Sequence, residues 1–125
     1  MGKFVNSIIG GPVTSAANTA ISTTITDAEL ESLNIIFESV AGNFPAGPLN
    51  ASVDVSIDGT NFHNIDNAIA LTAGVAKVSK FYSPVTVGAQ QAVNPLGFKA
   101  IKITVPALTG SIQGKITWSG KRKFY

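Results

Sequence analysis

Apolar and polar residues alternate most regularly over residues 52–65, SVDVSIDGTNFHNI. Val53, Val55 and Ile57 fall on one side of an extended chain, and the serine and aspartate residues between them fall on the other. Residues 58–61 (DGTN) follow with turn chemistry, because Asp can close an Asx turn and Gly accepts a positive φ. The segment therefore predicts a hairpin with one solvent-facing side and one buried side.

The same period of two recurs along the rest of the chain, and no segment shows a helical period for longer than two turns. Strands are expected over residues 20–25, 33–40, 77–84, 99–106 and 111–119, and residues 85–87 are expected to form a further short strand or the end of the preceding one. Loops rich in Gly or Pro are expected at 41–49 and 88–96. Residues 26–32 are interpreted as an acidic turn or a single helical turn. The pattern predicts an all-β fold: one antiparallel β-sandwich, jelly-roll-like or Ig-like, with about seven to eight strands and little helix.

A chain of 125 residues has the usual length of one domain and can hold a core without a metal or disulfide. We expect a sandwich domain over residues 20–120. Residues 1–19, interrupted by Gly-Gly-Pro, are expected to form an N-terminal arm or an edge strand. Residues 121–125 form a basic, aromatic C-terminal tail.

Charged residues make up only 13% of the chain, about half the usual share, and cysteine is absent. A deficit of charge suits a surface that is largely covered in an assembly, although it also suits an extracellular domain with a neutral polar surface. No run of 18 apolar residues occurs, so we expect no membrane insertion.

Catalytic chemistry has few candidates. His63 is the only histidine, and no serine lies in a GxSxG context, so His63 is interpreted as a solvent-facing strand residue. Four oxygen-bearing residues that could hold calcium do not match the spacing of the known calcium loop: Asp54, Asp58, Asn61 and Asp66. The acidic residues, Asp66 included, are expected in turns or on the solvent-facing side of strands. We therefore predict that the protein is not an enzyme and has no cofactor, metal or small-molecule substrate.

The two ends of the chain are the candidate interaction sites. The first is an apolar patch that would be costly to leave exposed, and it consists of Phe4, Val5, Ile8 and Ile9. The second is the C-terminal group Lys121, Arg122, Lys123, Phe124 and Tyr125. Three basic residues release too few counterions to hold nucleic acid tightly, so the expected partners are proteins.

Two further elements carry a resemblance to a known group of proteins. They are a turn (Ser56, Asp58, Gly59, Thr60, Asn61, Phe62) and a closing strand pair (Phe98, Ile101, Ile103, Val105, Thr109, Gly110, Gly114, Ile116, Trp118). Their order resembles small β-sandwich structural proteins of double-stranded DNA bacteriophage virions, of the capsid decoration, vertex or head–tail type. The resemblance covers about residues 50–120. This chain departs from it at Phe62, where such proteins often have Trp, and at Lys99, where Arg is usual.

The resemblance implies a virion location and a structural role without catalytic residues. The sequence hypothesis is a virion structural protein that forms homo-oligomers and binds other virion proteins, such as a major capsid or tail protein. The alternative is a carbohydrate- or receptor-binding module, in which exposed aromatic side chains such as Phe62, Tyr82 or Tyr125 stack on sugar rings.

Overall fold

The computed structural model describes residues 7–16, 18–26, 30–40, 42–47, 49–82, 95–109 and 112–122, with only the backbone at 7–9 and 122. These residues form two four-stranded sheets and contain no helix, which confirms the predicted β-sandwich. The strands are β1 (Ser7–Thr14), β2 (Ile21–Ile25), β3 (Leu30–Val40), β4 (Asn50–Ser56), β5 (His63–Ala70), β6 (Lys77–Tyr82), β7 (Ala100–Val105) and β8 (Gln113–Arg122). Nowhere in these ranges is a helix long and apolar enough to cross a membrane.

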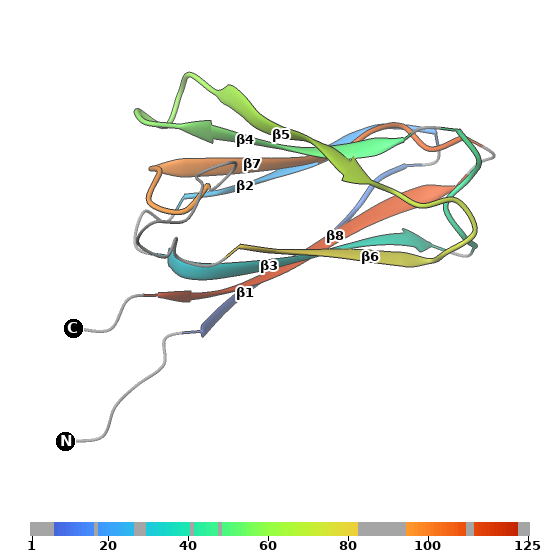
Figure 1. The fold of residues 1–125 in the computed structure, drawn as a ribbon, viewed down its shortest axis with the longest axis horizontal. Coiled ribbons are helices and arrows are strands. Elements are labelled where there is room, and N and C mark those ends of the chain that lie inside the picture. Colours follow the sequence, from blue (N-terminus) through green and yellow to red (C-terminus); the bar gives the residue numbers. More distant parts are fainter. Residues whose placement is uncertain are drawn as a thin grey trace, which may run out of the picture.

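The strand order distinguishes between the two sandwich types that the sequence allowed. One sheet, called sheet A, has the order β1-β8-β3-β6, and the other, sheet B, has the order β2-β7-β4-β5. The antiparallel pairs β1–β8, β2–β7, β3–β6 and β4–β5 are nested, as in one long hairpin wrapped into two layers. This is the jelly-roll arrangement of eight strands. Figure 1 shows the two sheets stacked, with the start of β1 and the end of β8 on the same side.

The core lies between the sheets and is built by alternate residues of the central strands. Leu33, Ile35 and Phe37 of β3 are fully buried from sheet A, and Ile101 and Ile103 of β7 are fully buried from sheet B. The alternation of β4 and β7 therefore places their valine and isoleucine side chains inward, as the sequence pattern predicts.

Within the predicted hairpin of residues 52–65, two residues contradict the alternation of buried and solvent-facing positions. Ile57 is 77% exposed, and Ser56, expected to face solvent, is fully buried. The reason is that β4 ends at Ser56, where the Ser56 hydroxyl donates to Asp58 and accepts from the Gly59 N–H. The chain turns at this point, so the period of two no longer determines where Ile57 points.

Some boundaries also differ from the expected ones. The strand predicted from residue 33 begins at Leu30, so part of the expected acidic or helical turn is extended, and residues 27–29 lie outside the described ranges. The short strand expected at 85–87 also lies outside them. Ser7–Thr14 forms the edge strand β1, with an irregular register between Gly10 and Val13, next to Pro12. Strand β8 extends to Arg122, into the segment predicted as a tail.

Candidate interaction surface

The pairing of β1 with β8 brings the two predicted interaction segments together. Ser7 lies opposite Lys121, Ile8 opposite Gly120, and Ile9 opposite Ser119. The start of β1 and the end of β8 therefore lie side by side at one end of sheet A, as Figure 1 shows. Of the candidates, Lys121 is exposed, while Ile8, Ile9 and Arg122 are placed by their backbone alone; Phe4, Val5, Lys123, Phe124 and Tyr125 lie outside the described residues.

A close contact determines how β1 lies on β8. Gly10 pairs with Trp118, and the indole ring covers the α-carbon of Gly10 so closely that a β-carbon there would overlap the ring. Trp118 also packs against the core. A residue without a side chain is therefore required at position 10 for the N-terminal strand to lie under the tryptophan.

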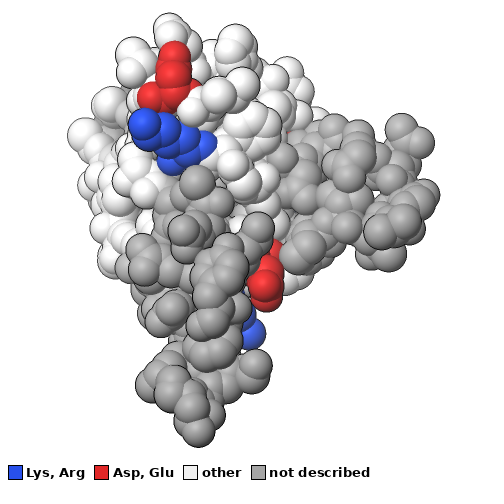
Figure 2. All heavy atoms as spheres, turned by 90° about the vertical axis from the view of Figure 1, so that its left-hand side faces the viewer, with Lys and Arg blue, Asp and Glu red and all other residues white. Residues whose placement is uncertain are grey.

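Figure 2 shows the side of the molecule that lies at the left of Figure 1, where basic and acidic side chains of the described residues form small groups among uncharged ones. On the outer side of sheet A, Glu38 contacts Lys77 at 3.7 Å and Lys115 at 3.8 Å. These pairs are partly exposed and contribute little to stability, about 0–1 kcal/mol each.

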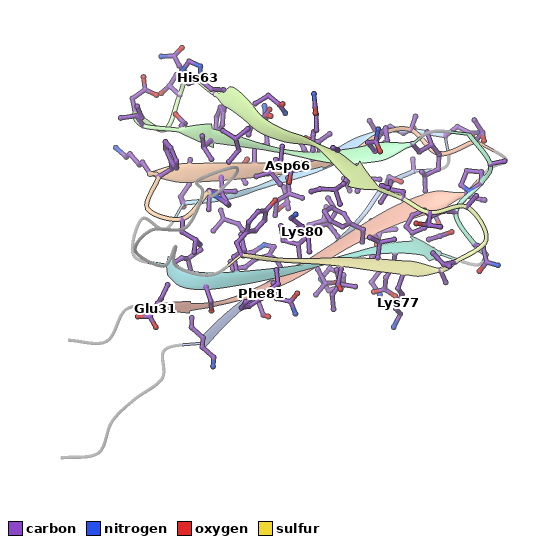
Figure 3. All side chains as sticks on the ribbon, viewed as in Figure 1. Glu31, His63, Asp66, Lys77, Lys80 and Phe81 are labelled. Atoms are coloured by element: carbon purple, nitrogen blue, oxygen red, sulfur yellow. The ribbon has the colours of Figure 1, made fainter. Side chains whose placement is uncertain are left out.

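An exposed aromatic side chain on sheet A was not among the sequence candidates. Phe81 is 61% exposed on the edge strand β6, opposite Asn34 of β3. Figure 3 shows Phe81 on the outer side of sheet A, whereas Lys80 lies between the sheets. Strict alternation from Val78 would have found it, because Val78, Lys80 and Tyr82 then face inward and Phe81 faces outward.

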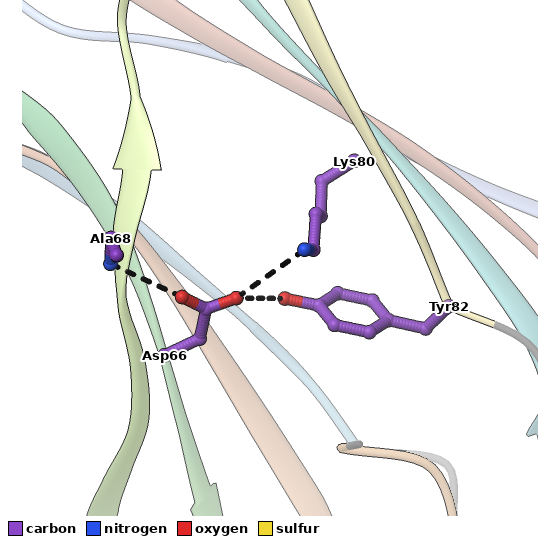
Figure 4. A network of polar contacts seen from close by, with 4 residues as sticks. All are labelled: Asp66, Ala68, Lys80 and Tyr82. Carbon is purple, nitrogen blue, oxygen red and sulfur yellow. Dashed lines mark hydrogen bonds and ion pairs between the residues drawn. The ribbon is translucent and has the colours of Figure 1, made fainter. Parts of the chain in front are cut away.

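A buried polar network joins the two sheets between their edge strands β5 and β6. The Tyr82 hydroxyl donates to Asp66 Oδ2 at 3.1 Å, and the Ala68 N–H donates to Asp66 Oδ1 at 3.1 Å. Lys80 Nζ lies 3.8 Å from Asp66 Oδ2 and 5.5 Å from the centre of the Tyr82 ring. Figure 4 shows these four residues bridging the gap between the strands. Burial and the nearby Asp66 carboxylate raise the pKa of Tyr82 above its ordinary value.

This network corrects two sequence expectations. Asp66, expected on a turn or a solvent-facing side, is only 8% exposed. Tyr82, proposed as a sugar-stacking aromatic, is only 5% exposed and has its hydroxyl engaged by Asp66. The cause is that β5 has an irregular register against β4, which moves Asp66 toward the core side of the strand.

The polar side chains of the β4–β5 turn form hydrogen bonds within the turn itself. Asp58 Oδ1 accepts bonds from the N–H groups of Thr60 and Asn61, both at 2.8 Å, and Oδ2 accepts from Asn61 Nδ2 at 2.7 Å. These bonds to the ionised form hold the pKa of Asp58 well below its ordinary value. Gly59 has the positive φ, 87°, that the turn was expected to require.

Other groups in this region do not converge on a site. Asp54 accepts a bond of 2.8 Å from Asn64, and His63 is exposed, as its position in the strand predicts. Lys102 Nζ lies 4.7 Å from the centre of the Phe62 ring, which leaves that half-buried ring partly covered. Within the described ranges, no three His, Asp or Glu side chains are close enough to hold a metal ion.

Comparisons with known proteins identify the fold but no family. No protein-family model matches the sequence, and no curated protein matches it. A structure of Bacillus endospore appendages, described as disulfide-linked pili, is similar over 100% of this chain and 93% of that chain, with a TM-score of 0.50 and 11% identity. Two larger proteins contain a more weakly similar domain.

The first of these is a putative α-L-fucosidase from Bacteroides thetaiotaomicron, with a TM-score of 0.44 and 11% identity over 90% of this chain and 22% of that chain. The second is tailspike protein 4 of bacteriophage CBA120, with a TM-score of 0.46 and 16% identity over 91% of this chain and 17% of that chain. The present chain therefore spans less than a quarter of either protein. Likeness at these identities concerns the fold alone.

Proposed function

We propose that this chain is a non-enzymatic structural subunit that associates with copies of itself and with a second, larger protein of the same assembly. The proposed assembly is a bacteriophage virion, and the second partner is a major capsid or tail protein. The observation that carries the proposal is the pairing of β1 with β8, which places Ile8 and Ile9 beside the strand end that carries Lys121. Adjacent strand ends of apolar and basic sequence suit contact with a protein partner.

Two further observations, together with a general property of symmetric assemblies, support this proposal. The chain carries unusually little charge, and charge is what keeps isolated monomers apart in solution. The jelly-roll fold occurs among viral capsid domains, although it also occurs in lectins, so the fold supports a virion role by analogy only. In a symmetric assembly, many weak contacts add up to strong retention without any single large interface.

The proposed contacts are noncovalent. The similar Bacillus structure is described as disulfide-linked pili, whereas the present sequence has no cysteine with which to make such links. Apolar contact by the N-terminal segment and charge-assisted contact by the C-terminal segment would take their place.

Truncation of the chain ends tests the self-association. One variant lacks residues 1–6 and another lacks residues 123–125, so both keep the β1–β8 pairing of residues 7–122. We expect sedimentation velocity to show concentration-dependent assembly of the full chain and weaker assembly of both variants. Fluorescence of Trp118, the single tryptophan, checks that the variants remain folded. A matched control is Thr72→Ser, an exposed position away from the chain ends, which should assemble as the full chain does.

A monomer at every concentration that is retained on a glycan column would overturn the proposal in favour of the carbohydrate-binding alternative. The virion location needs a separate measurement. An antibody raised against the protein should label purified phage particles by immunogold electron microscopy. Label that is found only on material separated from the particles would rule out the virion role and leave the self-association untouched.

A further inference from the structure

The four edge strands of the sandwich differ in how well they are protected against pairing with another chain. On one side of the molecule, β5 has two register irregularities and the inward-pointing Asp66, and β6 has the inward-pointing Lys80. Bulges and inward charges are the devices by which natural edges avoid pairing with other strands. Strand β1, at the other side, has an irregular register next to Pro12. These three edges are therefore poor templates for an added strand.

Strand β2, Ile21–Ile25, has none of these protections. Its sequence ISTTI contains no charge, no Gly and no Pro, and four of its five residues are β-branched. Its register with β7 is continuous from Ile21 opposite Val105 to Ile25 opposite Ile101. Within the described residues no strand pairs with its outer edge. The side chains of Ser22 and Thr24 are exposed on the outer face of sheet B. A regular, uncharged edge with strong β propensity is a template for strand addition.

The sequence of β2 is also close to a palindrome, which favours a second copy of the same strand as the occupant. In an antiparallel pair centred on Thr23, Ile21 lies opposite Ile25 of the second copy, and Ser22 lies opposite Thr24 of the second copy. Isoleucine thus meets isoleucine on the core side, and hydroxyl meets hydroxyl on the outer side. Pairs of both kinds stabilise antiparallel sheets.

We propose that two copies of this chain pair through β2, antiparallel and about a twofold axis at Thr23, so that sheet B continues from one copy into the next. The proposal rests on the self-association proposed above and names one of its interfaces. A twofold contact uses the same patch on both copies and closes after two. Larger assemblies then need a second contact, for which the chain ends are available.

Burial along β2 fits this arrangement. Ile25 is only 2% exposed and belongs to the core, whereas Ile21 is half-buried and packs at its margin. Pairing would cover the open side of Ile21 with Ile25 of the second copy and extend the apolar layer across the axis. A strand of five residues buries less than a standard interface, so the pair is expected to be weak alone and effective in an assembly.

A charge swap at the two exposed positions tests the register. Two double variants, Ser22→Lys with Thr24→Lys and Ser22→Glu with Thr24→Glu, each place like charges opposite one another in the proposed pair. We expect each alone to weaken pairing by about tenfold or more, and an equimolar mixture of the two to restore it. Mixing would not repair damage to the fold of either variant, so restored association reports on the pairing itself. The same holds for repulsion within one copy between a lysine at position 24 and its neighbour Lys102.

The matched control is Asn67→Lys with Ala70→Lys, at exposed positions of β5, which should leave association unchanged.

A second test uses Thr23→Cys in this cysteine-free chain, because residues on a twofold axis of an antiparallel pair lie within disulfide distance. We expect an intermolecular disulfide on mild oxidation, at a rate well above that of Ala70→Cys.

The outcomes separate the two proposals. If the full chain associates but the mixture shows no restoration and Thr23→Cys gives no excess of cross-linked dimer, the β2 interface is wrong and self-association stands. If the full chain is monomeric at every concentration, both are wrong. If both are right, removal of residues 1–6 together with residues 123–125 leaves dimers, and adding the charge variants to that truncation leaves monomers.

Discussion

The hydroxyl of Tyr82 donates a hydrogen bond of 3.1 Å to the carboxylate of Asp66 across the gap between the two sheets. Asp66 lies on β5 and Tyr82 on β6, which are edge strands of different sheets, so this bond closes one side of the sandwich. Lys80 lies on the same side and compensates the charge of Asp66. Polar contacts therefore join the two sheets along the side of the sandwich formed by β5 and β6.

Removing the hydroxyl should destabilise the fold measurably. In Tyr82→Phe, the buried Asp66 carboxylate loses one of its partners, and such a loss costs about 1–3 kcal/mol. Urea unfolding at neutral pH, followed by Trp118 fluorescence, measures the difference. The control is Ser79→Ala, an exposed change on the same strand that should cost less than about 0.5 kcal/mol. Equal stability of Tyr82→Phe and the unsubstituted protein would show that the bond contributes nothing.

The burial of Tyr82 beside the Asp66 carboxylate should make stability fall in alkaline solution. The pKa of Tyr82 is raised in the folded protein, whereas the unfolded phenol loses its proton near pH 10. Above about pH 10 the unfolded state therefore binds fewer protons than the folded state, and the free energy of unfolding decreases as pH rises. Tyr82→Phe lacks this contribution, so its deficit should shrink between neutral pH and about pH 11. A deficit that is constant with pH would argue against the raised pKa.

The turn at residues 58–61 should respond to acid. The pKa of Asp58 is lowered in the folded protein, so below about pH 4 the unfolded state takes up a proton before the folded state does. The stabilisation by the Asp58 carboxylate is present above that pH and is lost as pH falls. In thermal unfolding, Asp58→Asn should be less stable than the unsubstituted protein at neutral pH, and the two should converge in acid. Parallel curves down to strongly acidic pH would contradict the role of the ionised carboxylate.

Gly10 should tolerate no side chain. In Gly10→Ala the new methyl group overlaps the Trp118 ring, and either the ring or strand β1 must move, at a cost of about 1–3 kcal/mol. The comparison is Gly114→Ala, where the nearest atom is a methyl carbon of Val105 at 3.1 Å and a small adjustment suffices. Trp118 fluorescence should shift in Gly10→Ala and remain unchanged in Gly114→Ala. A larger loss of stability in Gly114→Ala would reverse this interpretation.

The local pattern of residues determined much of the secondary structure. Alternation placed Val53, Val55, Ile101 and Ile103 in the core, because side chains of an extended chain point to opposite faces in turn. The turn chemistry of Asp58 and Gly59 was also readable, since both act within a few residues of themselves. The recurring period of two, the turn-rich loops and the lack of sustained helical periodicity together predicted an all-β sandwich.

Contacts between residues far apart in the sequence determined the strand order and the burial of Asp66. Alternation could not distinguish the jelly-roll order from an Ig-like one, because pairing partners such as β1 and β8 are separated by most of the chain. Alternation also could not predict that Asp66 is buried, because its burial depends on the irregular pairing of β5 and on the hydrogen bond from Tyr82 of the other sheet. The proposed β2 interface has both origins: the near-palindrome is local sequence, but only the tertiary structure leaves that strand at an edge.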